Sequence, residues 1–557
     1  MSSSPSQFDE KFDLFDLRAT KFPELFFELN KGVTPLSFIR EKTHIKFLEE
    51  YLSEQKGLNA RYAVVEKSYI SKDYLSDFSY YYYSCFEEYS KFCNRVHFFS
   101  STLEKDDFIK SLKEKIIGEY NVFENSDDFW KKYYLGYIVV KPIPNFFIGF
   151  SVLKHYNSDI NSNSFKEQRY YWGVRPYKIH LFGTEIVLDS LAFQEQDRNV
   201  AACATIAIWS MLQRAAEDYY VILQSPGEIT KGAGLVSHGG NRLIPNKGLS
   251  ILQMAQAIVK NNMTPEVRGK DSYHGQDSFN LYLKKLVHAY SPVHIPIILA
   301  LDLPGSKTES GGGHAVAACG YNMSSLQENS RKLGLLKKIA KLFNKTIEWK
   351  AERINKIYCH DDQWGPFSRM WLTGSEKISS SWNLMTQNKK TAKCVALIIP
   401  VYHKIRIPFE DIESKVLGLH NILEEHLKDI IKESIVWDIQ LFLSEEFKLK
   451  FKESELLDLR NPVDQALQYK FLTRNFPKYI WVATMSIGNQ TIFNFIYDAT
   501  GLSGSNLIHT VVGYYNEINS ILIRILQDNI NTTTPTFIEI FDYNVQDFIS
   551  RIQDFNS

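Results

Sequence analysis

The stretch "RNVAACATIAIWSML" at residues 198–212 places a single cysteine, Cys203, at the start of an apolar segment. Residues 203–218 have the length and composition of a buried helix. The N-terminus of a helix carries N–H groups without helical partners and about half a positive charge, and both stabilise a thiolate. The stretch therefore predicts either a small core residue or a nucleophile at Cys203, and the rest of the chain has to decide.

Two later stretches offer partners for such a nucleophile. In "GGGHAVAACGYN" (311–322), His314 follows three glycines and opens an apolar strand. In "KIYCHDDQWGPF" (356–367), a strand ends in Asp361 and Asp362. An imidazole can activate a thiol at neutral pH, and a carboxylate can fix the tautomer of that imidazole.

A third stretch, "FQEQDRNVAAC" (193–203), precedes the cysteine and contains Gln194 and Gln196. The amide of a glutamine close to the nucleophile can donate to the oxyanion that forms when a carbonyl is attacked. The sequence leaves both glutamines as candidates for this donor.

The order Gln, Cys-helix, Gly-Gly-His-strand and strand-Asp resembles the papain-like cysteine peptidase superfamily. The similarity is closest to the bacterial peptidases that process double-glycine bacteriocin leaders and to their soluble relatives. The intervening stretches "NKGLSILQMAQAIVKNNMTPEVR" (246–268) and "PVHIPIILALDLPGSKTES" (292–310) are similar to the helix and strand of that family. The resemblance covers about residues 190–400.

This resemblance implies an α+β fold in which a helix bearing the cysteine packs on an antiparallel sheet bearing the histidine and the acid. It makes Cys203 the nucleophile, His314 the general base and Gln196 the oxyanion-hole donor, with no cofactor and no metal. Asp361 or Asp362 would orient His314. The end of the predicted strand favours Asp361, which we prefer, whereas the following Trp-Gly pair, similar to papain's Asn-Ser-Trp-Gly, favours Asp362.

The chain departs from the family pattern at several positions. Ala204 follows the nucleophile where the family usually has glycine, so a methyl group could crowd the cleft. Gln196 lies seven residues before Cys203, one more than the commonest spacing. The family's Asp-Pro is replaced by Asp-Asp at 361–362.

Length and composition bound the protein's class. The 557 residues predict about three domains. With 64 basic and 64 acidic residues, the net charge of zero gives no reason to expect nucleic acid or an anionic membrane as the main partner. The N-terminus has no signal-peptide pattern. The most apolar stretch, residues 133–153, is interrupted by prolines and predicts two strands rather than a membrane span.

The six cysteines lack a Cys-x-x-Cys pair and a zinc-like spacing, which favours free thiols in a reducing cytoplasm. Three of the cysteines lie inside apolar strands and are expected to be core residues, and three histidines other than His314 are expected to be structural. These residues are Cys319, Cys359 and Cys394, and His97, His238 and His360.

The patterning divides the chain into four parts. Residues 1–135 are predicted to be a mainly helical domain, and 136–190 a strand-rich segment that joins it to the core. Residues 191–400 are the predicted papain-like core, which contains a basic helical insertion at 322–356. Residues 401–557 are predicted to form a C-terminal α/β domain.

The insertion contains the most basic stretch of the chain, residues 331–356. A helix there would carry Leu336, Ile339, Phe343 and Ile347 on one face and lysines on the other. We expect this helix to pack on the core with a solvated basic face. The alternative is a docking element for an acidic partner, nucleic acid or a membrane surface.

The sequence thus predicts a cytoplasmic cysteine peptidase that acts on a peptide or protein and is regulated by its flanking domains or by a protein partner. The same triad could instead serve an isopeptidase, a deamidase or an acyl transferase, because sequence does not separate these reactions. Ala204, the displaced Gln196 and the insertion support a third hypothesis, a catalytically inactive interaction protein with a peptidase fold.

Overall fold

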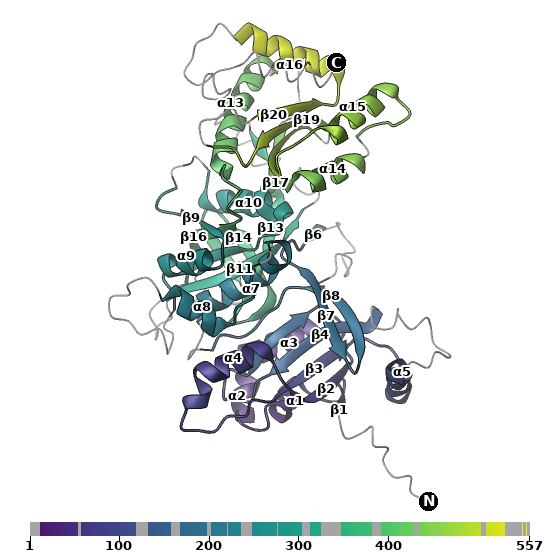
Figure 1. Ribbon diagram of the computed structural model, residues 1–557, viewed down its shortest axis with the longest axis vertical. Coiled ribbons are helices and arrows are strands. Elements are labelled where there is room, and N and C mark those ends of the chain that lie inside the picture. Colours follow the sequence, from purple (N-terminus) through teal and green to yellow (C-terminus); the bar gives the residue numbers. More distant parts are fainter. Residues whose placement is uncertain are drawn as a thin grey trace, which may run out of the picture.

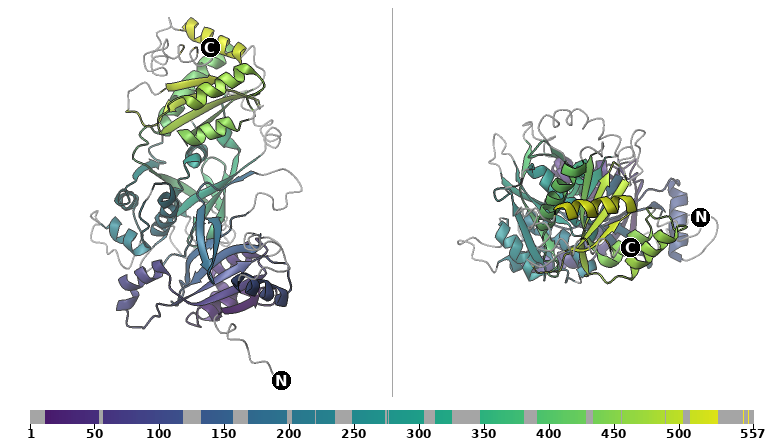
Figure 2. Two further views of the ribbon diagram at one scale, coloured as in Figure 1. Left: turned by 45° about the vertical axis from the view of Figure 1, so that its right-hand side comes forward. Right: turned by 90° about the horizontal axis from the view of Figure 1, so that it is seen from above.

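The computed structural model shows an elongated α+β protein in which three antiparallel sheets follow one another along the long axis (Figures 1 and 2). One short parallel pairing is added to the third sheet. The structure describes residues 12–53, 57–117, 132–156, 168–197, 202–219, 221–234, 248–273, 275, 277–303, 312–324, 347–380, 391–427, 434–454, 456–488, 490–502, 508–529, 549 and 553.

The strands of the first sheet are neighbours in chain order. They are β1 (Phe12–Asp16), β2 (Tyr62–Tyr69), β3 (Cys93–Phe99), β4 (Tyr134–Val140) and β5 (Ile148–Leu153). Every residue of β3 and β4 is buried, because both faces of the sheet are covered. This two-sided burial removes the alternation of exposed and buried residues that is typical of a half-exposed strand.

Two different layers cover this sheet. One face packs against α1 (Phe22–Leu29), α2 (Leu36–Glu41) and α3 (Thr43–Leu52). The other face packs against α4 (Lys72–Tyr80), α5 (Lys105–Ile117), the hairpin of β7 (Arg175–Leu181) with β8 (Thr184–Ser190), and α7 (Cys203–Tyr219). The helix that begins at Cys203 therefore shares a core with the N-terminal sheet.

This arrangement corrects the division expected at residue 135. Residues 1–135 are not a separate helical domain, because β1 to β3 pair with β4 and β5 in one sheet that crosses the expected boundary. The apolar stretch at 133–153 does form two strands, β4 and β5, as predicted. Within the described part of the chain, no helix is long and apolar enough to cross a membrane.

The second sheet contains a closed ring of six antiparallel strands, because its first strand pairs with its sixth. The ring consists of β10 (Ile297–Leu303), β11 (Gly312–Met323), β13 (Ile354–Asp361), β14 (Gly365–Thr373), β15 (Lys377–Ser380) and β16 (Ala392–Val401). Two further strands extend it: β9 (Thr264–Gly269) beside β16, and β6 (Gln168–Tyr170) beside β11.

Three helices lie against this ring on the side of the N-terminal sheet (Figure 1). α7 contacts β10, β11 and β13, and it packs in turn on α8 (Pro226–Ala233) and α9 (Ile251–Lys260). The helices expected at 203–218 and 246–262 are thus present, as are the strands expected around His314 and before Asp361.

The third sheet has the order β12 (Glu348–Trp349), β17 (Ile435–Leu443), β18 (Tyr479–Ile487), β19 (Gln490–Asp498) and β20 (Ile508–Gly513). One face packs on α14 (Ser444–Lys452) and α15 (Pro462–Thr473). The other face packs on α10 (Phe279–Tyr290), α13 (Phe409–Leu427) and α16 (Asn516–Asn529).

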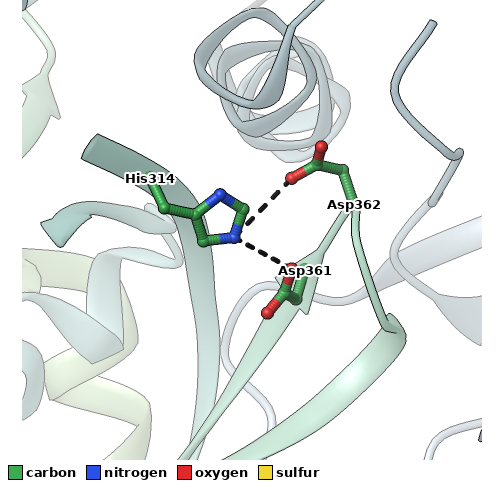
Figure 3. Close-up of side chains that lie close together, drawn as sticks. All are labelled: His314, Asp361 and Asp362. Atoms are coloured by element: carbon green, nitrogen blue, oxygen red, sulfur yellow. Dashed lines mark hydrogen bonds and ion pairs between the residues drawn. The ribbon is translucent and has the colours of Figure 1, made fainter. Parts of the chain in front are cut away.

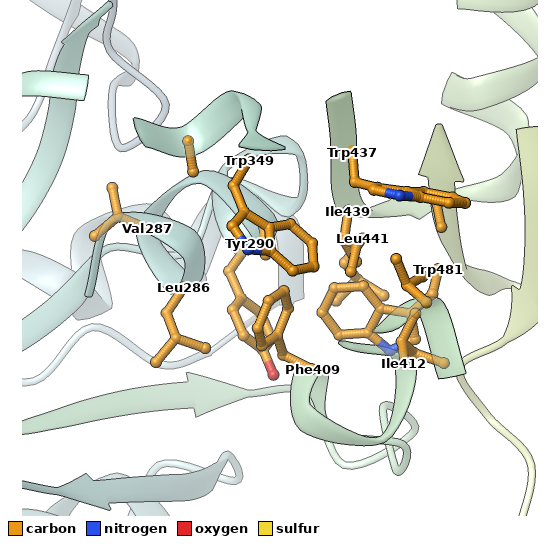
Figure 4. Packing of buried hydrophobic residues seen from close by; sticks show 14 of the residues in the cluster. Leu286, Val287, Tyr290, Trp349, Phe409, Ile412, Trp437, Ile439, Leu441 and Trp481 are labelled. Carbon is orange, nitrogen blue, oxygen red and sulfur yellow. The ribbon is translucent and has the colours of Figure 1, made fainter. Parts of the chain in front are cut away.

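The core between the second and third sheets is continuous across the boundary expected at residue 400. Tyr290 of α10 meets Trp481 of β18 with ring centroids 5.3 Å apart, and Trp349 packs close by (Figure 4). The C-terminal region therefore has two cores: one between the third sheet and α14 and α15, and one that it shares with the second sheet.

The end of the predicted basic helix is not helical. Residues 348–349 form β12, which pairs with β17, and Lys350–Arg353 form a 3-10 turn that leads into β13. Trp349 and Ala351 are buried, so packing against the third sheet overrides the helical pattern here. Leu336, Ile339 and Phe343 lie outside the described residues, and Ile347 packs against the core.

Candidate active site

Cys203 is the first residue of α7. The first helical hydrogen bond of this end runs from the Ile206 N–H to the Ala202 carbonyl, so the N–H groups of 203–205 lie ahead of the helical ladder. α7 is buried on all sides from Ala204 to Ala215, because the N-terminal sheet covers one side and the six-stranded ring of the second sheet covers the other. Cys203 itself is half-buried, at the end that stays accessible.

His314 is carried by β11, where it pairs with Leu301 of β10. The imidazole is buried, but the two preceding glycines face open space: a Cβ atom on Gly312 or Gly313 would meet nothing within 4 Å. The backbone beside the histidine is therefore accessible to a ligand, although the ring is not exposed to bulk solvent.

Asp361 ends β13 and lies beside His314. Its Oδ1 accepts a hydrogen bond from Nε2 of His314 over 3.0 Å, and it also accepts the Gln363 N–H over 3.0 Å. Asp362 Oδ1 lies 3.9 Å from the same Nε2 atom, so both carboxylates approach one edge of the ring (Figure 3). At these distances Asp361 is the hydrogen-bonded acid and Asp362 is an electrostatic neighbour.

Electrostatics around the ring favours its protonated form. Burial by itself would lower the pKa of His314, but the charge and hydrogen bond of Asp361, a hydrogen bond with the Cys203 thiol and the charge of Asp362 together raise this pKa well above its usual value. Because Nε2 faces the carboxylates, the opposite ring nitrogen, Nδ1, is the atom left for the thiol. Cys203 and Asp361 therefore both act on the same imidazole.

Asp362 has surroundings that differ from those of Asp361. Burial raises the pKa of its carboxyl to about 7, against the lowering effect of His314, and the neighbouring Asp361 adds to the increase. Neither oxygen of this carboxyl has a hydrogen-bond partner among the described residues. The two adjacent acids are therefore not equivalent, since one is held by hydrogen bonds and the other is not.

A cavity of about 920 Å³ opens beside these groups. Cys203, His314, Gln196 and Gln363 all line it. Its other walls are mostly apolar or small, and they include Ala204, so the methyl group after the nucleophile leaves the cavity open. The arrangement offers a nucleophile, a base and amide donors on one surface.

The turn at 248–250 forms part of the cavity wall. Gly248 has φ of +107°, a conformation that favours glycine. The Ser250 side chain caps α9, and the Ser250 N–H donates a hydrogen bond to Oε1 of Gln253 over 2.8 Å. This capping box fixes the turn beside the cavity.

Of the two candidate glutamines, the structure places Gln196 in the cavity wall, whereas Gln194 is buried and does not line it. His360 donates from Nε2 to the Leu191 carbonyl and accepts the Phe367 N–H at Nδ1, and burial lowers its pKa to about 4. His360 is therefore a neutral structural residue rather than a second base.

The other histidines and cysteines that were expected to be structural are buried wherever they belong to the described residues. His97 is fully buried beside the Tyr134 hydroxyl, and His238 lies outside the described residues. Cys319, Cys359 and Cys394 are buried free thiols, and burial raises the pKa of each. Their thiols are suited to packing rather than to nucleophilic attack.

The ligand atoms of His314, Asp361 and Asp362 lie within 4.8 Å of one another, a spacing that could accommodate a divalent cation. A cation there would have to replace the proton that Nε2 donates to Asp361. Nε2 cannot donate to Asp361 and bind a cation at the same time, whereas Nδ1 stays available to Cys203 in either case.

Sequence reasoning missed several cavity residues, including Gln363, Met254 and Ala300. Gln363 directly follows the two acids, which is the one signal that pointed to it. Met254 and Ala300 belong to a helix and a strand whose apolar patterns indicate only burial. No protein-family model matches this chain, and no curated protein is significantly similar to it.

Proposed function

We propose that the protein is a papain-like cysteine peptidase in which Cys203, His314 and Asp361 form the catalytic triad. The observation that carries this proposal is that His314 interacts with both other members of the triad. It donates a hydrogen bond from Nε2 to Asp361 over 3.0 Å, and it interacts with the thiol of Cys203 at the start of α7. The open cavity beside these groups supports it.

In the first half of the reaction, the thiol proton moves to Nδ1 of His314 and the thiolate attacks the carbonyl carbon of a peptide bond. The N–H groups at the start of α7 and the amide of Gln196 stabilise the oxyanion. When the C–N bond breaks, the imidazolium gives its proton to the leaving amine and the acyl group remains on Sγ as a thioester.

In the second half, His314 takes a proton from a water molecule, whose oxygen attacks the thioester carbon. The C–S bond breaks, the carboxylic product leaves, and the proton returns to the thiolate of Cys203. Asp361 stays ionised throughout, because its role is to hold the ring and to stabilise its charge.

The cavity supports a polypeptide substrate. Gly313, Ala315 and Ala300 line it near the proposed nucleophile and base, so a substrate backbone can approach without meeting large side chains. All six cysteines are free thiols, which fits a reducing compartment and supports a cytoplasmic location.

The experiment is to incubate the protein with a peptide library and with a thiol-reactive activity probe, and to analyse the products by mass spectrometry. We expect cleaved peptides, labelling at Cys203, and loss of both in Cys203→Ala; His314→Gln should abolish cleavage and strongly slow labelling. A product one mass unit heavier than the substrate would indicate deamidation instead. An unreactive Cys203 in the wild-type protein would contradict any catalytic use of the triad.

A further inference from the structure

The junction between α2 and α3 contacts the turn that carries the acids. Thr43 Oγ1 donates a hydrogen bond to the Gln363 carbonyl over 2.9 Å. His44 Nε2 lies 2.7 Å from the Asp362 carbonyl, and since a carbonyl only accepts, Nε2 carries the proton. Two neighbouring residues of the N-terminal region thus bond to consecutive carbonyls directly after Asp361.

The preceding residue contacts a second part of the site. Lys42 forms a buried ion pair with Glu195 and also donates to the Asn145 carbonyl over 2.8 Å. Glu195 accepts the Ile148 N–H as well and immediately precedes Gln196, which lines the cavity. The same three-residue segment, Lys42–His44, therefore contacts both the turn at 361–363, here called the acid turn, and the segment 195–196, which carries the proposed oxyanion donor.

Close packing limits how far α3 can shift against this turn. Gly365, which pairs with Asp361 across β13 and β14, lies against Phe47 of α3 so tightly that a Cβ atom would come within 2.3 Å of the ring. The contact is a packed interface rather than a surface contact, because His44, Glu195 and both acids are buried.

We propose that Lys42, Thr43 and His44 act as a positioning clamp, which holds Asp361 against His314 and Gln196 in the cavity wall. The N-terminal region is then part of the catalytic unit rather than only a substrate-recognition domain. This inference rests on the proposed peptidase function. None of the three residues lines the cavity, so they act through the residues they hold and are not themselves catalytic.

The test uses Thr43→Val, which keeps the shape and removes the donor, and Thr43→Val combined with His44→Leu. Thr43→Ser and His44→Gln restore a donor. Lys46→Ala is the matched control, because Lys46 lies on the same helix in an exposed ion pair with Glu41. All variants carry Cys85→Ser, since Cys85 is the other thiol that is not fully buried.

The readout is the rate of Cys203 alkylation by iodoacetamide at pH 6.5 and at pH 9.5. At pH 6.5 the thiolate depends on a protonated His314, whereas at pH 9.5 the thiol ionises without that help. We expect the double variant to react about 10-fold more slowly at pH 6.5 and within twofold of wild type at pH 9.5. Thr43→Val alone should show a smaller change in the same direction, and the donor-restoring variants should recover the wild-type ratio.

The clamp would be overturned, with the peptidase proposal left intact, if the ratio of the alkylation rate at pH 6.5 to that at pH 9.5 were equal in the double variant, Lys46→Ala and wild type. A wild-type Cys203 without enhanced reactivity at pH 6.5 would count against the triad itself and would overturn both. If the double variant does not fold, Thr43→Val decides the question, because it changes a single methyl-sized group.

Discussion

Replacing Asp361 or Asp362 by asparagine removes one negative charge beside His314 with little change of shape. Asp361 Oδ1 is 3.0 Å from Nε2 of His314 and Asp362 Oδ1 is 3.9 Å from it. Only the first distance is that of a hydrogen bond, so we expect Asp361→Asn to reduce activity much more than Asp362→Asn.

The magnitude follows from these distances. With an effective dielectric constant of about 20, the imidazolium is attracted by about 5.5 kcal/mol to a charge at the Asp361 position and by about 4 kcal/mol to one at the Asp362 position. Desolvation of the buried groups offsets much of this, and the net loss of a charge-assisted hydrogen bond is about 1.5–3 kcal/mol. Asp361→Asn should therefore lower kcat/KM by about 10- to 150-fold.

Asp362 should compensate for part of the loss. Burial and the neighbouring Asp361 raise the pKa of the Asp362 carboxyl to about 7, so it is incompletely ionised at neutral pH. Without the charge of Asp361, this carboxyl ionises more readily and attracts the imidazolium in its place. We expect Asp362→Asn alone to cost about threefold or less, and the double variant to lose more than the sum of the two by over about 0.5 kcal/mol.

The assay is kcat/KM between pH 5 and 9 for the wild type, both single variants and the double variant, with a peptide identified from the library. Alkylation of Cys203 at pH 6.5 provides a measurement that does not depend on turnover. Equal losses in the two single variants, or a double variant that is additive, would refute the assignment of Asp361 as the orienting acid.

Three further outcomes follow from the same contacts. Gln196→Ala should lower kcat about 100-fold with little change in KM, as expected for an oxyanion donor; a kcat within threefold of wild type would exclude that role. Glu195→Gln should lower the free energy of unfolding in urea by about 3–5 kcal/mol, because it leaves the buried Lys42 ammonium unpaired; a loss below about 1 kcal/mol would show that this pair is dispensable. Asp362→Asn should stabilise the fold at pH 8 by up to about 4 kcal/mol. The reason is that the Asp362 carboxyl has a pKa of about 7 in the fold, so the free energy of unfolding of the wild type falls as pH rises from about 4 to 7. This difference, followed by thermal melts, should vanish toward pH 4, and a pH-independent difference would contradict the raised pKa.

The sequence was sufficient to predict the elements that hold the candidate triad. Cys203 precedes a long apolar run, and His314 and Asp361 lie at the ends of apolar strands, so short-range patterning located all three. The pairing of β11 with β13 then brings His314 and Asp361 together, although 47 positions separate them in the chain. Pattern and order alone gave no indication that the second acid would lack hydrogen-bond partners.

The N-terminal sheet was not predictable in the same way. Only β4 and β5 were predicted; β3 is buried on both faces, so its sequence lacks the alternation that marks a strand, and the helices between β1, β2 and β3 dominate the local pattern. The strand at 348–349 was missed for a related reason, since its pairing partner β17 lies almost 90 residues further along the chain. Pairing over such separations is a property of the whole fold, which local propensity does not report.

The sequence by itself thus determined the candidate nucleophile, its base and the pair of acids, because these depend on residue type at the ends of strongly patterned elements. Only the tertiary structure decided which acid bonds His314, which glutamine lines the cavity, and that Thr43 and His44 bond to the acid turn more than 300 positions away. These choices depend on differences of about 1 Å or less between contacts of packed segments, such as the 3.0 Å and 3.9 Å distances from His314 to the two acids, and such contacts form only once the sheets and α3 are in place.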